Sequence, residues 1–303
     1  MRKNKIPKHE FPPLGAHMSI SGGLYKALLR GEKTGCQVIQ IFTRNRSRWK
    51  CKALSKKEID AFHEIRDKAT VIPVAAHNSY LINLASPRSN VAEESFHALL
   101  DELGRAELLG IPYLVMHPGA HLGEGEAKGL LRIAEGINRV HDRTEGYSVK
   151  ILLETTAGQG TSLGYRFEHL AEIIERTESK DRLGVCFDTC HAFAAGYDFR
   201  NLTTYKALFR DFDDVIGLNR LMLFHINDSK KELGSRVDRH EHPGGGKIGL
   251  QAFSQLLNDD RFSEHPFLLE TPKGEDGNGV DLDIINLNLL RGLKEGVHQD
   301  DHI

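Results

Sequence analysis

Seven short apolar segments of this chain are each followed directly by a histidine, an aspartate or a glutamate. The segments cover residues 14–16, 71–76, 113–116, 149–153, 183–187, 221–224 and 266–269, and the residues that follow them are His17, His77, His117, Glu154, Asp188, His225 and Glu270. Segments this short and this rich in Val, Ile and Leu are typical of strands buried on both faces. If the strands are parallel, their polar end residues meet at one opening, and histidines gathered there with carboxylates indicate a metal site.

Segments with helical periodicity lie between these strands. One runs from Asn90, which we expect to cap a helix together with Glu93, to Gly110. An eighth apolar segment, residues 38–42, follows a helix-like stretch. Eight strands alternating with helices predict an α/β fold of the (β/α)8 TIM-barrel type, with long loops on its carboxyl-terminal face. An open, doubly wound sheet is the alternative, but it would spread the polar strand ends along an edge, and the chain has no G-x-G-x-x-G loop.

The length of the chain fits one barrel better than two domains. It has 303 residues, of which 40% are hydrophobic, enough for one large core. We expect a basic N-terminal extension at residues 1–13, a single catalytic barrel domain at residues 14–295 and a frayed polar tail at residues 296–303. Two histidines of that tail, His298 and His302, are therefore not expected to bind metal.

Composition narrows the setting in which the protein works. A formal net charge of −2 gives no overall sign of a polyanionic partner, although it leaves room for a local basic surface. No apolar stretch approaches about 20 residues, so we expect no membrane span, and the basic N-terminus lacks the apolar region of a signal peptide. The four cysteines show no disulfide-type spacing, which indicates a reduced, cytoplasmic protein. Nothing in the sequence requires more than a monomer.

Two further pairs of ligand-type residues lie in loops that follow strands. Asp188 and His191 are three residues apart, and Asp238 and His240 lie in a charged, glycine-rich loop after the seventh strand. Taken alone, either pair is typical of a solvated loop. Together with the strand ends they make nine candidate metal ligands: His77, His117, Glu154, Asp188, His191, His225, Asp238, His240 and Glu270.

Nine ligands suit three zinc ions if one carboxylate bridges two of them, because each ion then has three or four protein ligands and an open position. Imidazole-rich ligation favours Zn²⁺ over Mg²⁺, which prefers oxygen ligands. The four carboxylates carry −4 against +6 on three divalent ions, which leaves +2. A bound hydroxide and one phosphodiester anion would bring the cluster close to neutral, so the charge balance favours a phosphodiester over a neutral sugar as substrate.

A basic segment follows the second predicted strand. Between Lys33 and Lys57 there are eight Lys or Arg residues and no Asp or Glu. Trp49, the only tryptophan of the chain, is surrounded there by Arg44, Arg46, Arg48 and Lys50. A solvated loop is the plain alternative. Because the loop lies on the same face as the candidate ligands, however, it would form a basic, aromatic rim of the kind that suits a nucleic-acid backbone.

Weaker candidates lie near these groups. Tyr80 is a second aromatic residue on the rim, with packing beneath a loop as an equal alternative. Gln159 lies between two glycines, whose backbone N–H groups would either bind a phosphate or simply form a turn. Cys190 is expected to pack as a small buried residue. Three histidines are candidates for orienting the metal ligands: His17, His121 and His242.

Seven stretches that contain these polar residues follow one another in a definite order and spacing. They are residues 77–83, 117–121, 154–160, 185–198, 225–230, 234–240 and 269–271, and they include Asp-Thr-Cys-His at residues 188–191. Together they resemble the endonuclease IV family of abasic-site nucleases. The resemblance extends from about residue 14 to residue 270, and the block around Asp188 is its most specific part.

The resemblance implies a (β/α)8 barrel that holds three zinc ions and cleaves double-stranded DNA on the 5′ side of an abasic site. The products would be a 3′-hydroxyl and a 5′-deoxyribose phosphate, and trimming of 3′ ends is a further expectation. Carried over position by position, the resemblance assigns three ligand sets: His77, His117 and Glu154; Glu154, Asp188, His225 and Glu270; and His191, Asp238 and His240. A hydroxide held near Glu154 and Glu270 would attack phosphorus, and no side chain would be needed as general base.

The loop after the second strand departs from the family pattern. The family has a Gln-Arg pair that enters the DNA stack opposite the lesion, whereas this chain has Arg46 and Ser47 at those positions. Ser47 is too short to fill the gap left by an expelled nucleotide. We therefore predict that Arg46 or Arg48 acts as the wedge, and that Tyr80 helps to hold a bent duplex.

Two other functions compete with the nuclease. A sugar isomerase or epimerase on a related barrel needs only Glu154, Asp188, His225 and Glu270 around one ion, and has no use for the other five candidates or for a basic loop. A barrel that only binds damaged DNA would be expected to have lost ligands, yet all nine are present. The sequence therefore favours the nuclease.

Overall fold

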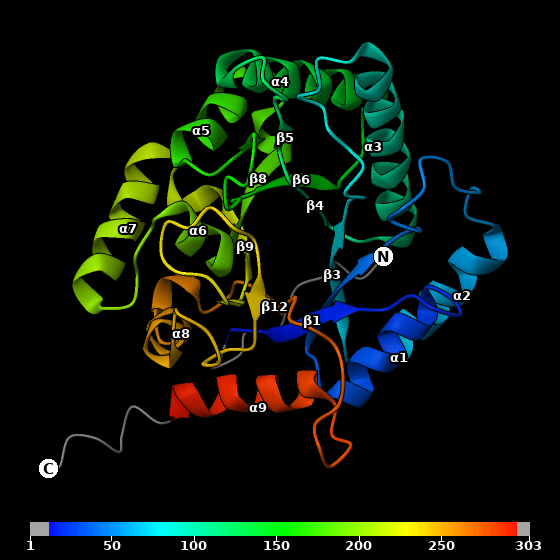
Figure 1. Cartoon of the computed structure of the whole chain (residues 1–303). Coiled ribbons are helices and arrows are strands. Elements are labelled where there is room, and N and C mark those ends of the chain that lie inside the picture. Colours follow the sequence, from blue (N-terminus) through cyan, green and yellow to red (C-terminus); the bar gives the residue numbers. More distant parts are fainter. Residues whose placement is uncertain (1–11, 296–303) are drawn as a thin grey trace, which may run out of the picture.

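The computed structural model describes residues 12–295, which form a closed barrel of eight parallel strands (Figure 1). The strands are β1 (Leu14–Met18), β2 (Val38–Phe42), β3 (Ile72–His77), β4 (Tyr113–Met116), β6 (Lys150–Glu154), β8 (Leu183–Asp188), β9 (Leu221–His225) and β12 (Phe267–Leu269). They pair in chain order, and the barrel closes because β1 pairs in parallel with both β2 and β12. The predicted TIM barrel is confirmed, and the open sheet is excluded.

The helices surround the barrel, as Figure 1 shows. They are α1 (Tyr25–Thr34), α2 (Lys56–Lys68), α3 (Ser89–Leu109), α4 (Glu126–Arg143), α5 (Phe167–Arg176), α6 (Thr189–Ala195), α7 (Leu202–Val215), α8 (Leu250–Leu257) and α9 (Leu282–Glu295). Short 3₁₀ turns precede three strands, at Lys180–Arg182, Leu218–Arg220 and Asp260–Phe262.

The start of α3 differs from its prediction. The helix begins at Ser89, so Asn90 is already inside it and its side chain is not at the capping position. The preceding residue, Arg88, has an extended backbone and provides no side-chain cap. The helix ends as predicted at Gly110, whose left-handed conformation a glycine adopts without strain. A capping box does occur in the chain, between Ser55 and Glu58 at the start of α2.

Two apolar layers hold the barrel together. Side chains that point inward form a small interior cluster, which includes Val38, Val115 and Leu268. Side chains that point outward, such as Ile39 and Ile41, join a much larger layer under the helices. Because successive residues of a strand face opposite sides, Gln40 shares the inward face with Val38. The apolar interior therefore ends near Gln40, and polar residues fill the carboxyl-terminal end of the barrel.

Two small antiparallel sheets shape the loops at that end. One pairs β5 (Gly119–Ala120) with β7 (Ser162–Leu163), and the other is a hairpin of β10 (Asp228–Ser229) and β11 (His240–Glu241). The hairpin is fixed by the buried Asp228 carboxylate, which accepts hydrogen bonds from the backbone N–H groups of Ser229, Gly244, Gly246, Ile248 and Gly249. A charge-assisted network of this kind holds a glycine-rich loop in one conformation.

The remaining predictions concern disulfides, a membrane span and the boundaries of the barrel domain. None of the four cysteines, all within residues 12–295, forms a disulfide. No helix in that range combines the length and apolarity needed to cross a bilayer. The carbonyl of Pro13 accepts a hydrogen bond from the Phe267 N–H, so the barrel engages the chain one residue before the boundary set at residue 14. His298 and His302 lie outside the described residues, and the division into extension, barrel and tail stays a prediction.

Gly15 lies where β1 and β2 are too close for a side chain. A Cβ atom at this position would overlap the carbonyl oxygen of Val38, whereas one at Gly292 in α9 would meet open space. We expect Gly15→Ala to lower the free energy of unfolding by about 3 kcal/mol, because the strands would have to separate. The control, Gly292→Ala, should raise it by about 0.5–1 kcal/mol. Urea unfolding measures both, and wild-type stability of Gly15→Ala would contradict this packing.

Candidate metal centre

The closed barrel brings the polar strand ends together. His77, Glu154, Asp188 and His225 are the last residues of β3, β6, β8 and β9. His117 and Glu270 follow the ends of β4 and β12. Parallel strands end on the same side of a barrel, so the side chains that the sequence placed on separate strands meet at one opening.

Glu154 is at the centre of this group, and its two oxygens face different histidines. Oε2 lies 3.1 Å from Nε2 of His77 and 3.2 Å from Nε2 of His117. Oε1 lies 2.9 Å from Nδ1 of His225 and 3.3 Å from Nδ1 of His191. The carboxylate is fully buried, which is costly for a charge without partners. One oxygen on each side is the arrangement that a bridging carboxylate needs.

The remaining candidates complete two further groups of ligand atoms. Nδ1 of His225 lies 3.3 Å from Oε2 of Glu270 and 3.8 Å from Oδ2 of Asp188. On the other side, Asp238 lies between two imidazoles, with Oδ2 3.1 Å from Nε2 of His191 and Oδ1 3.3 Å from Nε2 of His240. In each of three sets the ligand atoms lie within 4.8 Å of one another: His77, His117 and Glu154; Glu154, Asp188, His225 and Glu270; His191, Asp238 and His240.

Hydrogen bonds to backbone carbonyls set the protonation of three imidazoles. Nδ1 of His77 donates to the Asn78 carbonyl at 2.9 Å, and Nδ1 of His191 donates to the Thr155 carbonyl at 2.9 Å. Nδ1 of His240 donates in the same way to the Glu270 carbonyl at 3.1 Å. A carbonyl oxygen only accepts, so Nδ1 carries the hydrogen and Nε2 of each neutral ring offers a lone pair toward the centre.

This protonation pattern tests whether the residues fit a metal. Nε2 of His191 and Nε2 of His240 face each other at 3.3 Å. Two neutral rings would point lone pairs at one another, so a proton or a metal cation is needed between them. The Asp238 carboxylate beside both nitrogens favours a cation as well. The imidazole-rich donor set fits zinc.

The ionisation of the centre follows from the same contacts. Burial by itself lowers the pKa of His191, but Asp188 and Asp238 outweigh it and raise this pKa well above its ordinary value. The pKa of His77 is also raised, because Glu154 outweighs its burial. Burial would raise the pKa of Glu154, yet His225 and His117 hold it well below its usual range. Without metal, these pKa shifts favour imidazolium at His77 and His191 beside an ionised Glu154 carboxylate.

The centre is open to solvent on one side only. The side chains of Glu154, Asp188 and His225 are inaccessible, while those of His117 and Asp238 are 36% and 38% exposed. A substrate would therefore approach over His117 and Asp238.

Two cysteines lie among the ligand atoms but are poor ligands. Cys186 lies near Glu154 and His225, and Cys190 near Asp188 and His240. Burial raises the pKa of each thiol to about 12, so both are neutral and lack the thiolate that binds metal. Cys190 is fully buried, in agreement with the prediction that it packs as a small residue.

The three histidines expected to orient ligands fall into two groups. Nδ1 of His17 lies 3.5 Å from Oε1 of Glu270, so His17 contacts a candidate ligand. His121 instead accepts hydrogen bonds from the N–H groups of Gly123 and Gly125 in its own loop. His242 bonds to Asn286 through Nδ1. The last two therefore hold loops in place: His121 bonds within its own loop, and His242 ties the end of β11 to α9.

Two residues that contact the ligands were missed in the sequence. Asn227 donates to Oδ2 of Asp188 at 2.8 Å and accepts from the Glu270 N–H at 2.8 Å. Gln40 contacts His225 and Glu270. A signal existed for Gln40, since it is an amide within an otherwise apolar strand, whereas Asn227 in a polar loop gave none.

Arg44 does not lie at the surface of the predicted basic rim, where the sequence analysis placed it. This side chain is buried, and its Nε donates to Oε1 of Glu102 at 2.8 Å while Nη1 donates to the Trp49 carbonyl at 2.9 Å. Glu102 also accepts from the Ser79 N–H, so one acid of α3 holds the loops after β2 and β3. Arg44 is thus placed to fasten the rim and does not reach the surface where DNA would lie.

Arg46 and Tyr80 form a contact at the edge of the centre. The Arg46 guanidinium lies 5.3 Å from the Tyr80 ring centre and 5.4 Å from that of Phe42. Tyr80 is 61% exposed, which excludes packing beneath a loop, and its ring centre lies 5.9 Å from that of His77. Arg48 is exposed, and Trp49 packs partly against the core.

Gln159 supports a candidate ligand. Its side-chain oxygen accepts a hydrogen bond from the Asp238 N–H at 3.1 Å, which ties the two loops together. Gln159 is itself exposed, so it borders the opening.

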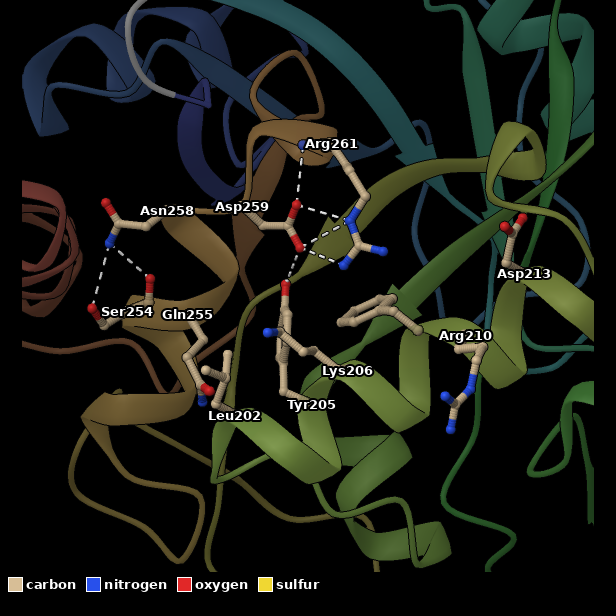
Figure 2. Close-up of a pocket in the computed structure, with 11 residues that line it drawn as sticks. Leu202, Tyr205, Lys206, Arg210, Asp213, Ser254, Gln255, Asn258, Asp259 and Arg261 are labelled. Atoms are coloured by element: carbon tan, nitrogen blue, oxygen red, sulfur yellow. Dashed lines mark hydrogen bonds and ion pairs between the residues drawn. The ribbon is translucent and has the colours of Figure 1, made fainter.

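A separate hollow of about 740 Å³ lies on the helical layer between α7 and α8. Figure 2 shows Tyr205 donating to Asp259, whose carboxylate is also bonded by Arg261. Asp259 and Arg261 pair with each other there, and none of the nine candidate ligands lines this hollow. The chemistry of the molecule is therefore concentrated at the barrel opening.

Fold and site together define a TIM-barrel protein with several possible metal-binding groups of side chains at its opening. The sequence profile of the xylose isomerase-like TIM barrel family matches residues 29–290. A protein called probable endonuclease 4 from Chloroflexus aggregans is 54% identical over 282 residues, which cover 93% of this chain and 98% of that protein. Its namesake from Geobacter sulfurreducens is 53% identical over 92% of this chain and 94% of its own length.

Solved structures agree with these relatives. Endonuclease IV from Thermus thermophilus superposes with a TM-score of 0.81 and 35% identity, over 94% of this chain and all of that one. A D-tagatose 3-epimerase-like protein superposes with a TM-score of 0.70 at 20% identity, over 94% of this chain and 98% of that one, and shares the fold alone. The chain belongs to the endonuclease IV family. It is accordingly a nuclease rather than a carbohydrate enzyme.

Zinc binding should release protons from the metal-free protein. His77 and His191 have pKa values raised above 6.5, so they hold protons near neutral pH and must lose them to bind metal. We expect the apparent zinc affinity to rise with pH above about 6.5. Isothermal titration calorimetry in buffers of different ionisation enthalpy measures the release, and a heat that is independent of the buffer would contradict this ionisation.

Proposed function

We propose that this protein is a DNA-repair endonuclease that hydrolyses the phosphodiester 5′ to an abasic site through three zinc ions. The products are a 3′-hydroxyl and a 5′-deoxyribose phosphate, and the same centre trims damaged 3′ ends. The observation that carries this proposal is the two-sided contact of Glu154, which joins the histidine pair at β3 and β4 to the four-residue set. The monomeric state and the cytoplasmic location stay predictions from the sequence.

The nine residues would hold the ions in the three sets that the structure brings together. His77, His117 and Glu154 hold one ion, and Glu154 shares a second with Asp188, His225 and Glu270. His191, Asp238 and His240 hold the third. Bound zinc supplies Lewis-acid activation of the phosphodiester and of water, whose pKa it lowers to roughly 7.

The residues around the ligands keep this geometry in place. Asn227 fixes the Asp188 carboxylate relative to the Glu270 backbone, and Gln159 holds the loop that presents Asp238. Sites whose ligands are held by such contacts lose little energy to reorganisation when they bind metal or substrate.

The DNA partner is inferred from the rim. We assign the wedge to Arg46 rather than Arg48, because Arg46 already lies against Tyr80 beside the centre. A guanidinium supported by an aromatic ring can enter a base stack where a nucleotide has been expelled. Ser79 donates a hydrogen bond to the Arg46 carbonyl, which keeps the two loops together.

The isomerase alternative shares one part of the site. This chain shares its fold with a D-tagatose 3-epimerase-like protein, and the four-residue set around Glu154 is sufficient for one ion. In such an enzyme, the two histidines of the first set would have no role. The three residues of the third set would have none either. Relatives named endonuclease 4, with about half of their residues identical, further support the nuclease.

The test of the proposed function is incision of a duplex that carries one abasic site. We expect a cut 5′ to the site that leaves an extendable 3′-hydroxyl, that a strong zinc chelator abolishes, and that is absent from a duplex without the lesion. Glu154→Gln should lower the incision rate at least about 100-fold, since even partners of metal ligands often matter by 10–100-fold. No chelator-sensitive incision would overturn the proposal, and full activity of Glu154→Gln would overturn the bridging role.

The wedge assignment predicts a difference between two neighbouring arginines. Arg46→Ala should weaken binding to an abasic duplex about tenfold more than binding to an intact duplex, because it removes a stacking contact at the lesion. Arg48→Ala is the matched control and should weaken both complexes to a similar extent through a lost phosphate contact. Fluorescence anisotropy over a range of salt concentrations measures both. Equal losses for the two duplexes in Arg46→Ala would show that another residue is the wedge.

A further inference from the structure

The loop that follows β2, residues 43–54, has few backbone hydrogen bonds of its own. Among the described residues, a single backbone-to-backbone bond joins two members of this loop, from the Arg48 N–H to the Asn45 carbonyl at 3.4 Å. A segment with so few internal bonds ordinarily opens easily. This one carries Arg46 and Trp49, so the presentation of the basic rim depends on whatever else holds the loop.

Side chains bind this loop at every third position. The carbonyl groups that accept their hydrogen bonds belong to Thr43, Arg46, Trp49 and Lys52. Arg105 of α3 holds the two ends, with Nη1 3.5 Å from the Thr43 carbonyl oxygen and Nη2 donating to the Lys52 carbonyl. The Ser79 hydroxyl donates to the Arg46 carbonyl. Nη1 of Arg44 donates to the Trp49 carbonyl at 2.9 Å. The loop is therefore fixed at both ends and at two points between them.

These side chains meet on one face of α3. A single oxygen of Glu102 accepts from Nε of Arg44 at 2.8 Å and from the Ser79 N–H at 3.1 Å. Arg105 lies three positions further along the helix, which places it beside Glu102, and its Nε donates to Asp101 at 2.8 Å. We call Glu102, Arg105, Arg44 and Ser79 the α3 clasp, and all four are buried.

Stability alone does not explain the α3 clasp. Burial raises the pKa of Glu102 above its ordinary value, although Arg44 and the Ser79 N–H act against it, so the carboxylate is not fully compensated for its loss of water. Apolar residues of similar size often stabilise a fold as well as a buried ion pair does, or better. The pair gives a defined geometry instead, because carboxylate and guanidinium groups bond in fixed directions.

We propose that Glu102 and Arg105 are positioning residues, which hold the loop after β2 in its DNA-binding conformation before DNA arrives. Both are buried, so they act through the loop and not on the DNA itself. A loop that is already ordered loses less entropy on binding, and the α3 clasp therefore strengthens substrate binding without changing the chemical step. The effect on DNA rests on the proposed function. The ordering of the loop does not, because it belongs to the DNA-free protein.

Two variants remove the α3 clasp in independent ways. Arg105→Met removes the bonds to both ends of the loop, and its former partner Asp101 is 38% exposed and can turn to water. The double variant Arg44→Met/Glu102→Leu removes both members of the buried pair at once, so that neither charge is left unpaired inside the protein. Each variant tests the proposal if the other fails to fold.

Arg220→Met is the matched control. Arg220 also donates to two backbone carbonyls, those of Lys180 and Leu183. It directly precedes β9, however, and therefore lies at the end of the barrel opposite the opening. We expect Arg220→Met to lower the melting temperature, as Arg105→Met does, and to leave the loop after β2 as it is in the wild type.

Trp49 reports the state of the loop directly. It is the only tryptophan of the chain, it lies within the loop, and it packs partly against the core. Acrylamide quenching of its fluorescence in DNA-free protein, well below the melting temperature, measures how often the loop opens. We expect the quenching constant to rise about twofold in both clasp variants, because the freed loop opens locally. It should stay at the wild-type value in Arg220→Met.

Incision of a duplex with one abasic site provides the second measurement. Both clasp variants should raise KM about tenfold, which corresponds to ordering one or two further side chains on binding. They should leave kcat and the amount of bound zinc unchanged. A role in stability alone would lower the melting temperature and would change neither KM nor the quenching of Trp49.

The outcomes separate the two proposals. Wild-type quenching of Trp49 in the clasp variants would overturn the role of Glu102 and Arg105, and so would a fall in kcat at unchanged KM. A wild-type protein that does not incise abasic DNA would overturn the proposed function. The quenching of Trp49 would then still decide whether α3 holds the loop.

Discussion

The structure depends on one buried charge, the carboxylate of Glu154 at the end of β6. It has no access to solvent, and each of its oxygens faces two imidazoles. A lone carboxylate in this place would be strongly destabilising, so the surrounding strands must supply positive charge, either as imidazolium or as metal ions. The barrel provides this charge because its parallel strands end on the same side, where the histidines at the ends of β3, β4 and β9 lie next to Glu154.

The arrangement also explains how a barrel used by sugar epimerases supports a nuclease. The ligand atoms of the four-residue set around Glu154 lie close enough together to hold one ion. Adding a histidine pair on one side and the Asp238 hairpin on the other extends the site without changing the strands. The hairpin stays in place because the buried Asp228 gathers backbone N–H groups from the following loop.

Much of the fold and site could be predicted because both follow from local patterns. Apolar segments ending in polar residues define the strands, and closure of the barrel brings those polar residues together at one opening. The prediction failed where the deciding partner is distant in the sequence. Arg44 stands in an acid-free segment, yet its acid, Glu102, comes from α3. Gln40 contacts His225 at the end of β9 and Glu270 after β12, and only closure of the barrel brings these residues close to β2. The predicted cap of α3 is wrong because the helix begins at Ser89, two residues before the start that a cap at Asn90 requires.

The central claim is that three ions lie around Glu154, and anomalous X-ray diffraction at the zinc edge tests it most directly. Crystals of the protein purified with zinc should show three peaks at the barrel opening, two of them on opposite oxygens of Glu154 and one between His191 and His240. A single peak among Glu154, Asp188, His225 and Glu270 would contradict the account and would instead support the one-ion chemistry of an isomerase.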